Sequence, residues 1–85
     1  MKTIRVKVDW CDKNFGASVG DNVPGAIAVT GKTLDELKKA VAEAVGFHVE
    51  GMQADGDTVP GWLADGDYRF EWQLTPAAML RSVEP

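Results

Sequence analysis

Apolar and polar positions alternate along two stretches of the chain, and both stretches predict β-strands with one solvent-exposed face. Near the N-terminus the apolar set is Ile4, Val6, Val8 and Trp10, and it alternates with Arg5, Lys7 and Asp9. Near the C-terminus the apolar set is Tyr68, Phe70, Trp72 and Leu74, and it alternates with Arg69, Glu71 and Gln73. A period of two puts successive side chains on opposite faces of a sheet, so each strand has one face for the core and one for solvent.

Two shorter strands are expected between these stretches. The first follows a turn at residues 12–14, and its apolar positions are Phe15, Ala17 and Val19. A second turn at residues 22–25 contains Pro24-Gly25, and the β-branched run of residues 26–30 then predicts another strand. The short connections favour an antiparallel meander of the three N-terminal strands.

The apolar period changes to that of a helix at Leu34, and we expect this helix to end near residue 52. Its apolar stripe consists of Leu34, Leu37, Val41, Ala44, Val45, His48 and Met52. Thr33 stands three residues before Glu36, the spacing at which each side chain accepts a hydrogen bond from the other's backbone N–H. Gly46 weakens a helix, and we expect a close helix–sheet approach to explain its presence. Gly51 marks the expected C-terminal end.

A polar connection is expected over residues 53–67, where Ala-Asp-Gly-Asp occurs twice, at 54–57 and 64–67. Paired aspartates suggest calcium, but the glutamate that completes an EF-hand loop is missing, and two Asp-Gly turns are the better interpretation. After the last strand, Thr75 and Pro76 predict the cap and first position of a short helix, for which the chain offers no packing partner.

These elements predict an α+β fold in the order β-β-β-α-β, followed by a short C-terminal helix. The long helix lies on one face of the sheet and carries the chain over to the fourth strand. With the third strand parallel to the first, the simplest arrangement places the fourth strand beside the first and parallel to it. The expected strand order is therefore 3-2-1-4, with the other face of the sheet partly open.

Length and composition favour one small globular domain. The chain has 85 residues, 45% of them apolar, and no run of about 18 apolar residues that would span a membrane. The alternating N-terminus lacks the apolar block of a signal peptide. Cys11 is the only cysteine, which excludes an internal disulfide and suits a reducing compartment. We therefore expect a cytoplasmic protein without a membrane partner.

Charge is distributed unevenly along the chain. The net charge is −4, made up of +2 over residues 1–40 and −6 over residues 41–85. Tight binding to phosphates needs clustered Lys and Arg, so this domain is a poor nucleic-acid binder by its charge alone. The acidic half could contact a basic partner, or it could be a solvated surface that aids solubility.

The candidate chemistry is sparse, and we expect no catalytic residue, no metal site and no cofactor. The single histidine, His48, lies on the apolar stripe of the helix, and Cys11 has no ligand neighbour at metal-binding spacing. One enzymatic alternative is a two-metal nuclease with Asp9 on the first strand and Glu43 on the helix. Glu71 is the only acid that the fourth strand adds, so convergence of the carboxylates is not expected.

Several motifs of the chain resemble the N-terminal domain of HicB-type antitoxins. The resemblance covers residues 3–74 and rests on the strand from Phe15, the turn at residues 23–26, the strand at residues 28–31 and the helix entry at residues 33–37. Its most specific part is the Pro-Gly turn with Gly-Xaa-Thr-Xaa-Xaa-Glu. Ala26 stands where the family often has cysteine. The resemblance implies a partial ribonuclease-H-like sheet without nuclease activity over residues 1–74.

The resemblance also implies an antitoxin that binds a small basic RNA-cleaving toxin. Family members continue into a DNA-binding module, so residues 75–85 are expected to begin a truncated one, with DNA contacted and transcription regulated only through the full module. We also expect a homo-oligomer. The expected toxin contact combines an aromatic side chain with acids, namely Trp62, Asp55, Asp57, Asp65 and Asp67. The alternatives are a core role for Trp62, and for the chain an orphan interaction or small-molecule-binding module.

Overall fold

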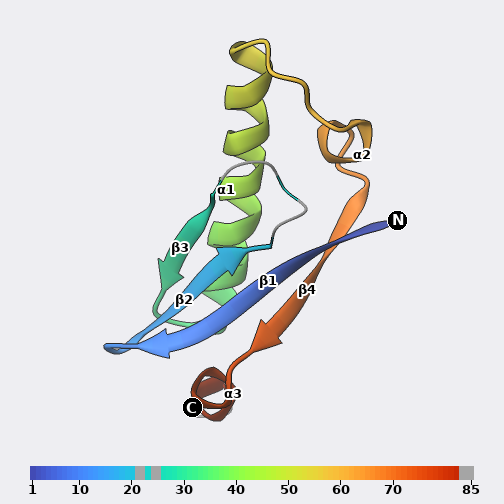
Figure 1. Cartoon of the computed structure of the whole chain (residues 1–85). Coiled ribbons are helices and arrows are strands. Elements are labelled where there is room, and N and C mark those ends of the chain that lie inside the picture. The colour runs from blue at the N-terminus through green and yellow to red at the C-terminus, as the bar shows by residue number, and fades with distance from the viewer. Residues whose placement is uncertain (21–22, 24–25, 83–85) are drawn as a thin grey trace.

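The described residues form one four-stranded sheet, one long helix and two short helices (Figure 1). The computed structural model describes residues 1–20, 23 and 26–82. In chain order the elements are β1 (Lys2–Cys11), β2 (Asn14–Val19), β3 (Ala28–Gly31), α1 (Leu34–Ala54), α2 (Gly61–Ala64), β4 (Tyr68–Leu74) and α3 (Pro76–Ser82). This arrangement confirms the α+β fold class. None of the helices in these ranges has the length and apolar character needed to cross a membrane.

The strand order is β3-β2-β1-β4, as the sequence predicted. β1 pairs antiparallel with β2, and β2 pairs antiparallel with β3, so the first three strands form a meander. β4 returns beside β1 and runs parallel to it, with Ile4 opposite Phe70 and Val6 opposite Trp72. The apolar sets of β1 and β4 therefore share one face of the sheet. β3 and β4 are the two edge strands.

The β1–β2 hairpin turns over two residues rather than the expected three. Asp12 and Lys13 both have positive φ, 49° and 73°, and Cys11 pairs directly with Asn14. Two consecutive positive φ values are the mark of a type I′ turn, whose twist matches that of the flanking strands. The expected turn at residues 22–25 lies outside the described residues except for Val23, which is buried. β3 begins two residues later than the sequence suggested.

The core lies between α1 and the face of the sheet that carries the apolar set of β1 (Figure 1). The buried stripe of the helix consists of Leu37, Val41, Val45 and Val49. The predicted stripe did not include Val49, which is buried. It did include His48 and Met52, which are only half-buried. On β1 the alternate residues Arg5, Lys7 and Asp9 are exposed, so the opposite face of the sheet is open to solvent.

The start of α1 follows the predicted cap with one change of partner. The Glu36 N–H donates to Thr33 Oγ1 at 3.1 Å, as expected. The Glu36 carboxylate, however, accepts from the N–H of Lys32 at 3.2 Å, not from that of Thr33. The side chain thus binds the backbone one residue further out and ties the β3–α1 corner to the first turn of the helix.

Two expectations for the glycines of α1 are wrong. Gly51 does not end the helix, which continues to Ala54. Gly46 is exposed, and a Cβ built there would meet nothing within 4 Å, so no close packing explains it. The close approach occurs at Gly31 instead, where a Cβ would lie 2.8 Å from the backbone nitrogen of Leu37.

The C-terminal helix α3 packs against the sheet, contrary to the expectation that it has no partner. Its cap is the predicted one, because the N–H of Ala78 donates to Thr75 Oγ1 at 3.3 Å. Ala78 is fully buried, and the helix contacts β1 more than β4. α3 therefore completes the end of the core that lies at the bottom of Figure 1.

Candidate functional site

The first Ala-Asp-Gly-Asp segment forms the end of α1. The N–H of Asp57 donates to the carbonyl of Met52 at 2.9 Å, and the N–H of Gly56 donates to the carbonyl of Gln53 at 3.2 Å. These two bonds define a Schellman motif, which needs a left-handed residue after the last helical turn. Gly56 supplies it with φ of 77°.

The second Ala-Asp-Gly-Asp segment repeats this arrangement at the end of α2. The N–H of Asp67 donates to the carbonyl of Trp62 at 2.8 Å, the N–H of Gly66 donates to the carbonyl of Leu63 at 3.3 Å, and Gly66 has φ of 73°. The repeat is therefore a helix terminator used twice, which confirms the turn interpretation. Its backbone bonds, not an ion, explain the spacing of the aspartates.

The four aspartates of these motifs form what we call the acidic turns: Asp55, Asp57, Asp65 and Asp67. All four are exposed. Asp55 and Asp57 follow α1 at the top of Figure 1, and Asp65 and Asp67 lie between α2 and β4. The stretch from residue 53 to residue 67 contains no Lys or Arg, so it carries a charge of −4. Such a stretch favours cationic partners.

Trp62 lies on α2, a helix that was not predicted because residues 53–67 were expected to form a loop. It is half-buried and packs against the core, and its neighbour Leu63 is 2% exposed. The available signal was Pro60 before an apolar pair, since proline often precedes a first helical turn. The structure therefore supports a core role for part of the Trp62 side chain, and the rest of the side chain is accessible.

Trp62 begins a continuous series of aromatic rings along β4, which we call the aromatic row: Trp62, Tyr68, Phe70 and Trp72. Successive ring centroids lie 6.2, 5.6 and 5.3 Å apart, within the range of favourable aromatic pairs. Lys38 Nζ lies 5.4 Å from the centroid of the Trp72 ring. α1 lies closer to β3 and β2 than to β4, and the side chains of the aromatic row are only half-buried.

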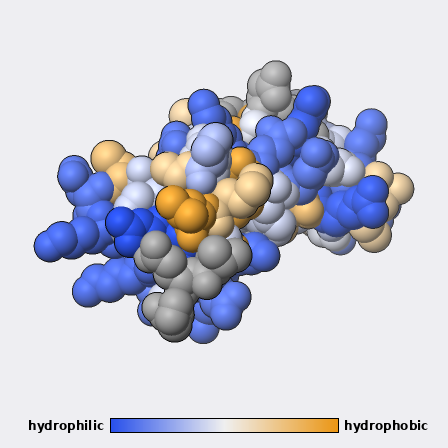
Figure 2. All heavy atoms as spheres, turned by 90° about the horizontal axis from the view of Figure 1, so that it is seen from below, coloured by the Kyte–Doolittle hydropathy of each residue, from blue (hydrophilic) through white to orange (hydrophobic). Residues whose placement is uncertain are grey.

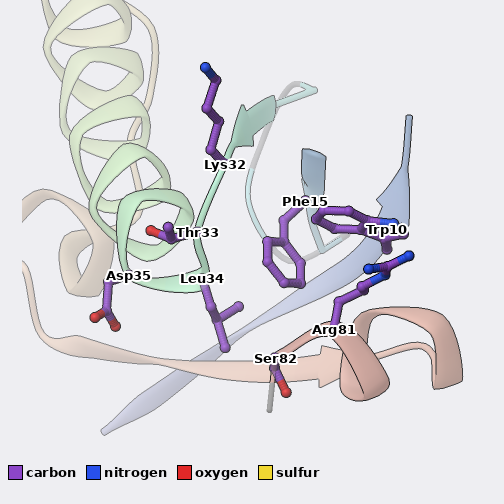
Figure 3. Close-up of a pocket in the computed structure, with 8 residues that line it drawn as sticks. All are labelled: Trp10, Phe15, Lys32, Thr33, Leu34, Asp35, Arg81 and Ser82. Atoms are coloured by element: carbon purple, nitrogen blue, oxygen red, sulfur yellow. The ribbon is translucent and has the colours of Figure 1, made fainter. Parts of the chain in front are cut away.

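A hollow of about 390 Å³ lies at the other end of the molecule, between the start of α1 and α3 (Figure 3). Its apolar wall is formed by Trp10 and Phe15, whose ring centroids are 4.9 Å apart, and the Arg81 guanidinium lies 5.1 Å from the Trp10 ring centroid. The polar lining has both charge signs, with Lys32, Arg81 and Asp35. The mixed lining selects no particular ligand charge.

The surface beside this hollow is mostly polar. Met79 and Leu80 of α3 are exposed, by 57% and 66%. Viewed from below, where α3 lies, the molecule shows a small apolar area within a largely polar surface (Figure 2).

The carboxylates of the nuclease alternative are spread over both sides of the sheet. Asp9 is exposed on the open face of β1, whereas Glu43 is exposed on α1, which covers the other face. Glu71 shares the open face but pairs opposite Arg5, four residues along β1 from Asp9, about 13 Å at the usual strand rise. Among the described residues, no three His, Cys, Asp or Glu side chains are grouped closely enough to hold a metal ion.

The remaining candidate residues, Cys11 and His48, lie on different elements of the fold. Cys11 is exposed at the end of β1, and His48 is half-buried on α1. A scan against protein-family models, a search of curated proteins and a search of solved structures found no match to this chain.

Proposed function

We propose that this chain is a cytoplasmic binding domain that holds a small basic protein, as an antitoxin of the HicB type holds its toxin. The observation that carries the proposal is the position of the exposed acidic turns before and after the half-buried Trp62. An apolar ring with part of its surface accessible, next to uncompensated negative charge, suits a partner with a positively charged face.

Trp62 and the acidic turns have complementary tasks in this proposal. Aromatic side chains that are already packed lose little conformational freedom on binding, and they supply much of the affinity in protein interfaces. The contact of Trp62 with Tyr68 fixes its ring in this way. The aspartates attract and orient the basic partner over longer distances, an effect that weakens as salt rises.

A small basic RNA-cleaving toxin fits this chemistry, because an RNA-binding face is rich in Lys and Arg. On this proposal the domain masks that face. Residues 1–85 are not expected to bind operator DNA specifically, since their net charge is −4 and α3 folds back onto β1. DNA binding and transcriptional control belong to a further module in this proposal.

The test is binding to the product of a short basic reading frame next to this gene, measured by calorimetry at two salt concentrations. The variant Asp65→Asn/Asp67→Asn should weaken binding about tenfold or more and reduce its salt dependence. The control Asp9→Asn/Glu43→Gln removes the same charge from exposed positions elsewhere and should bind like the parent. Failure of the folded parent to bind, or equal binding by both variants, would contradict the proposal.

The hollow at Trp10 and Arg81 favours a small-molecule-binding module as the second candidate. A ligand seated there would displace the Arg81 guanidinium from the Trp10 ring and change its fluorescence. A fluorescence screen with Trp10→Phe as the control distinguishes this candidate, because it needs no neighbouring toxin gene.

A further inference from the structure

The outer edge of β4 is unpaired in the described part of the chain. β4 is the longer of the two edge strands, with seven residues against four in β3. α3, which follows it, packs mainly over β1 and so leaves the outer side of β4 uncovered. β4 contains no proline, and its register with β1 is regular over its whole length. An exposed, regular edge of this kind is a template for another strand.

The backbone groups that face this edge follow from the ladder between β4 and β1. Just beyond the last strand pair, the N–H of Thr75 donates to the carbonyl of Val8 at 2.9 Å. Residues of a strand in a parallel ladder alternate between bonding to that neighbour and facing away from it. The odd-numbered residues of β4 therefore bond to β1, and the N–H and C=O groups of Phe70 and Trp72 face outward.

We propose that a second copy of this chain occupies the edge, with the two β4 strands antiparallel and the two Phe70 residues opposite each other at a two-fold axis. The two sheets then join into one continuous sheet with both copies of α1 on the same side. In this arrangement the outward-facing groups of each Phe70 bond to those of the other copy. Tyr68 of each copy stands opposite Trp72 of the other, with the same backbone bonding.

Charge complementarity favours this register over those centred on the two neighbouring residues, Arg69 and Glu71. Centring the pair on Phe70 places Arg69 opposite Glu71 of the second copy, and symmetry repeats this ion pair. These residues occupy the pairs without direct backbone bonds, in which opposing side chains come closest. Centring on Arg69 would oppose two arginines, and centring on Glu71 would oppose two glutamates. A register in which Phe70 of one copy faced Glu71 of the other is also excluded, because directly opposed side chains would then lie on different faces of the sheet.

The aromatic row gains from the same register. Tyr68, Phe70 and Trp72 are each only half-buried in the single chain. Paired about Phe70, the aromatic sets of the two copies lie next to each other on one face, where aromatic pairs across strands are favourable. Self-pairing thus covers apolar surface that α1 leaves accessible.

The test is the molar mass of the purified chain alone over a range of concentrations, by sedimentation equilibrium. The parent should dimerise. Arg69→Glu and Glu71→Arg should each weaken dimerisation about tenfold or more, since each variant creates two like-charged pairs. The double variant Arg69→Glu/Glu71→Arg exchanges the charges, and it should restore dimerisation.

The single variants need a fold control because Glu71 also lies opposite Arg5 within its own sheet. Thermal melting of each variant provides it, and Arg69→Glu is the cleaner change because its own-sheet neighbour is Thr3. A folded Arg69→Glu/Glu71→Arg variant that stays monomeric would overturn the proposed register.

Hydrogen exchange gives an independent readout of the edge. The amides of Phe70 and Trp72 should become protected as concentration rises, whereas those of Arg69 and Glu71 should be protected throughout. A parent that is monomeric at all concentrations would overturn the proposal. So would a dimer whose dissociation constant is unchanged by the substitutions of Arg69 and Glu71. Because no basic partner is present, these results are independent of the function proposed above.

Discussion

The ring of Trp62 meets the ring of Tyr68 nearly edge-on, at an interplanar angle of 83° and a centroid distance of 6.2 Å. This contact joins the short helix α2 to the first residue of β4. It explains why a helix of only four residues has a defined place, since one turn of helix has little stability of its own. Trp62 therefore has a structural task besides the binding task proposed for it.

The two tasks of Trp62 can be separated by substitution. Trp62→Ala should lower the free energy of unfolding by about 2 kcal/mol, less than for a fully buried ring, and should abolish measurable binding of the basic partner. Trp62→Phe keeps a ring against Tyr68 and should restore most of the stability. Denaturant unfolding and calorimetry measure the two effects. Undiminished partner affinity in folded Trp62→Ala would show that another residue dominates the contact.

Replacing two of the glycines by alanine should change the free energy of unfolding in opposite directions. Gly46→Ala should raise the free energy of unfolding by up to about 1 kcal/mol, because the helix gains propensity and the new Cβ meets nothing. Gly31→Ala should lower it, because its Cβ would lie 2.8 Å from the Leu37 backbone nitrogen. Urea unfolding of both variants checks this pair, and a stabilised Gly31→Ala would contradict the close approach of β3 and α1.

The face assignment of α1 can be tested with adjacent aspartates. Val41 is 0% exposed, so Val41→Asp would bury an unpaired charge and should unfold a domain of this size. Ala42→Asp introduces the same side chain one residue later, on the exposed side, and should cost less than about 1 kcal/mol. Circular dichroism melting distinguishes them, and a cooperative transition in Val41→Asp would show that the helix faces the sheet differently.

The cap of α1 should be worth about 1 kcal/mol. Thr33→Ala removes the oxygen that accepts from the Glu36 N–H and should lower the free energy of unfolding by that amount. Thr58→Ala removes the same hydroxyl from an exposed loop position and serves as the control. If the two variants unfold at the same denaturant concentration, the cap contributes nothing measurable.

The purified domain is expected not to cleave RNA or DNA with Mg²⁺ or Mn²⁺. Two-metal hydrolysis needs carboxylates around ions about 4 Å apart, and Asp9 and Glu43 lie on opposite sides of the sheet. A gel assay with labelled substrates measures this. Cleavage by the parent that disappears in Asp9→Asn would show instead that the domain is a metal-dependent nuclease.

The sequence predicted the parts of the fold that depend on periodic burial. The alternation in β1 and β4 follows directly from one buried and one solvated face, and the helical stripe around Val41 follows in the same way. The strand order followed from short hairpins and one long crossover. These features repeat over many residues, so a single irregular position does not hide them.

Features that depend on one residue or on tertiary contacts were harder to predict. Gly51 was the expected end of the helix, and only the paired backbone bonds to the carbonyls of Met52 and Gln53 show that Gly56 ends it instead. The packing of α3 depends on Ala78, a small side chain with little hydrophobic signal. The acidic turns and Trp62 were predicted as contact residues, but the aromatic row was not, because half-burial follows from where α1 sits on the sheet.

The Schellman motif of α1 places Asp55 and Asp57 where the helix already exposes carbonyl groups. The macrodipole gives this end a partial negative charge, and the last turn contains no Lys or Arg to offset it. The negative charge of each aspartate therefore destabilises the helix that it follows, by roughly 0.3–1 kcal/mol at low salt. The free domain should consequently be less stable than a version with asparagines there, and a cation that binds this end would remove a repulsion built into the fold. Under the proposed function, removing these charges should raise the free energy of unfolding of the free domain and lower its affinity for the basic partner.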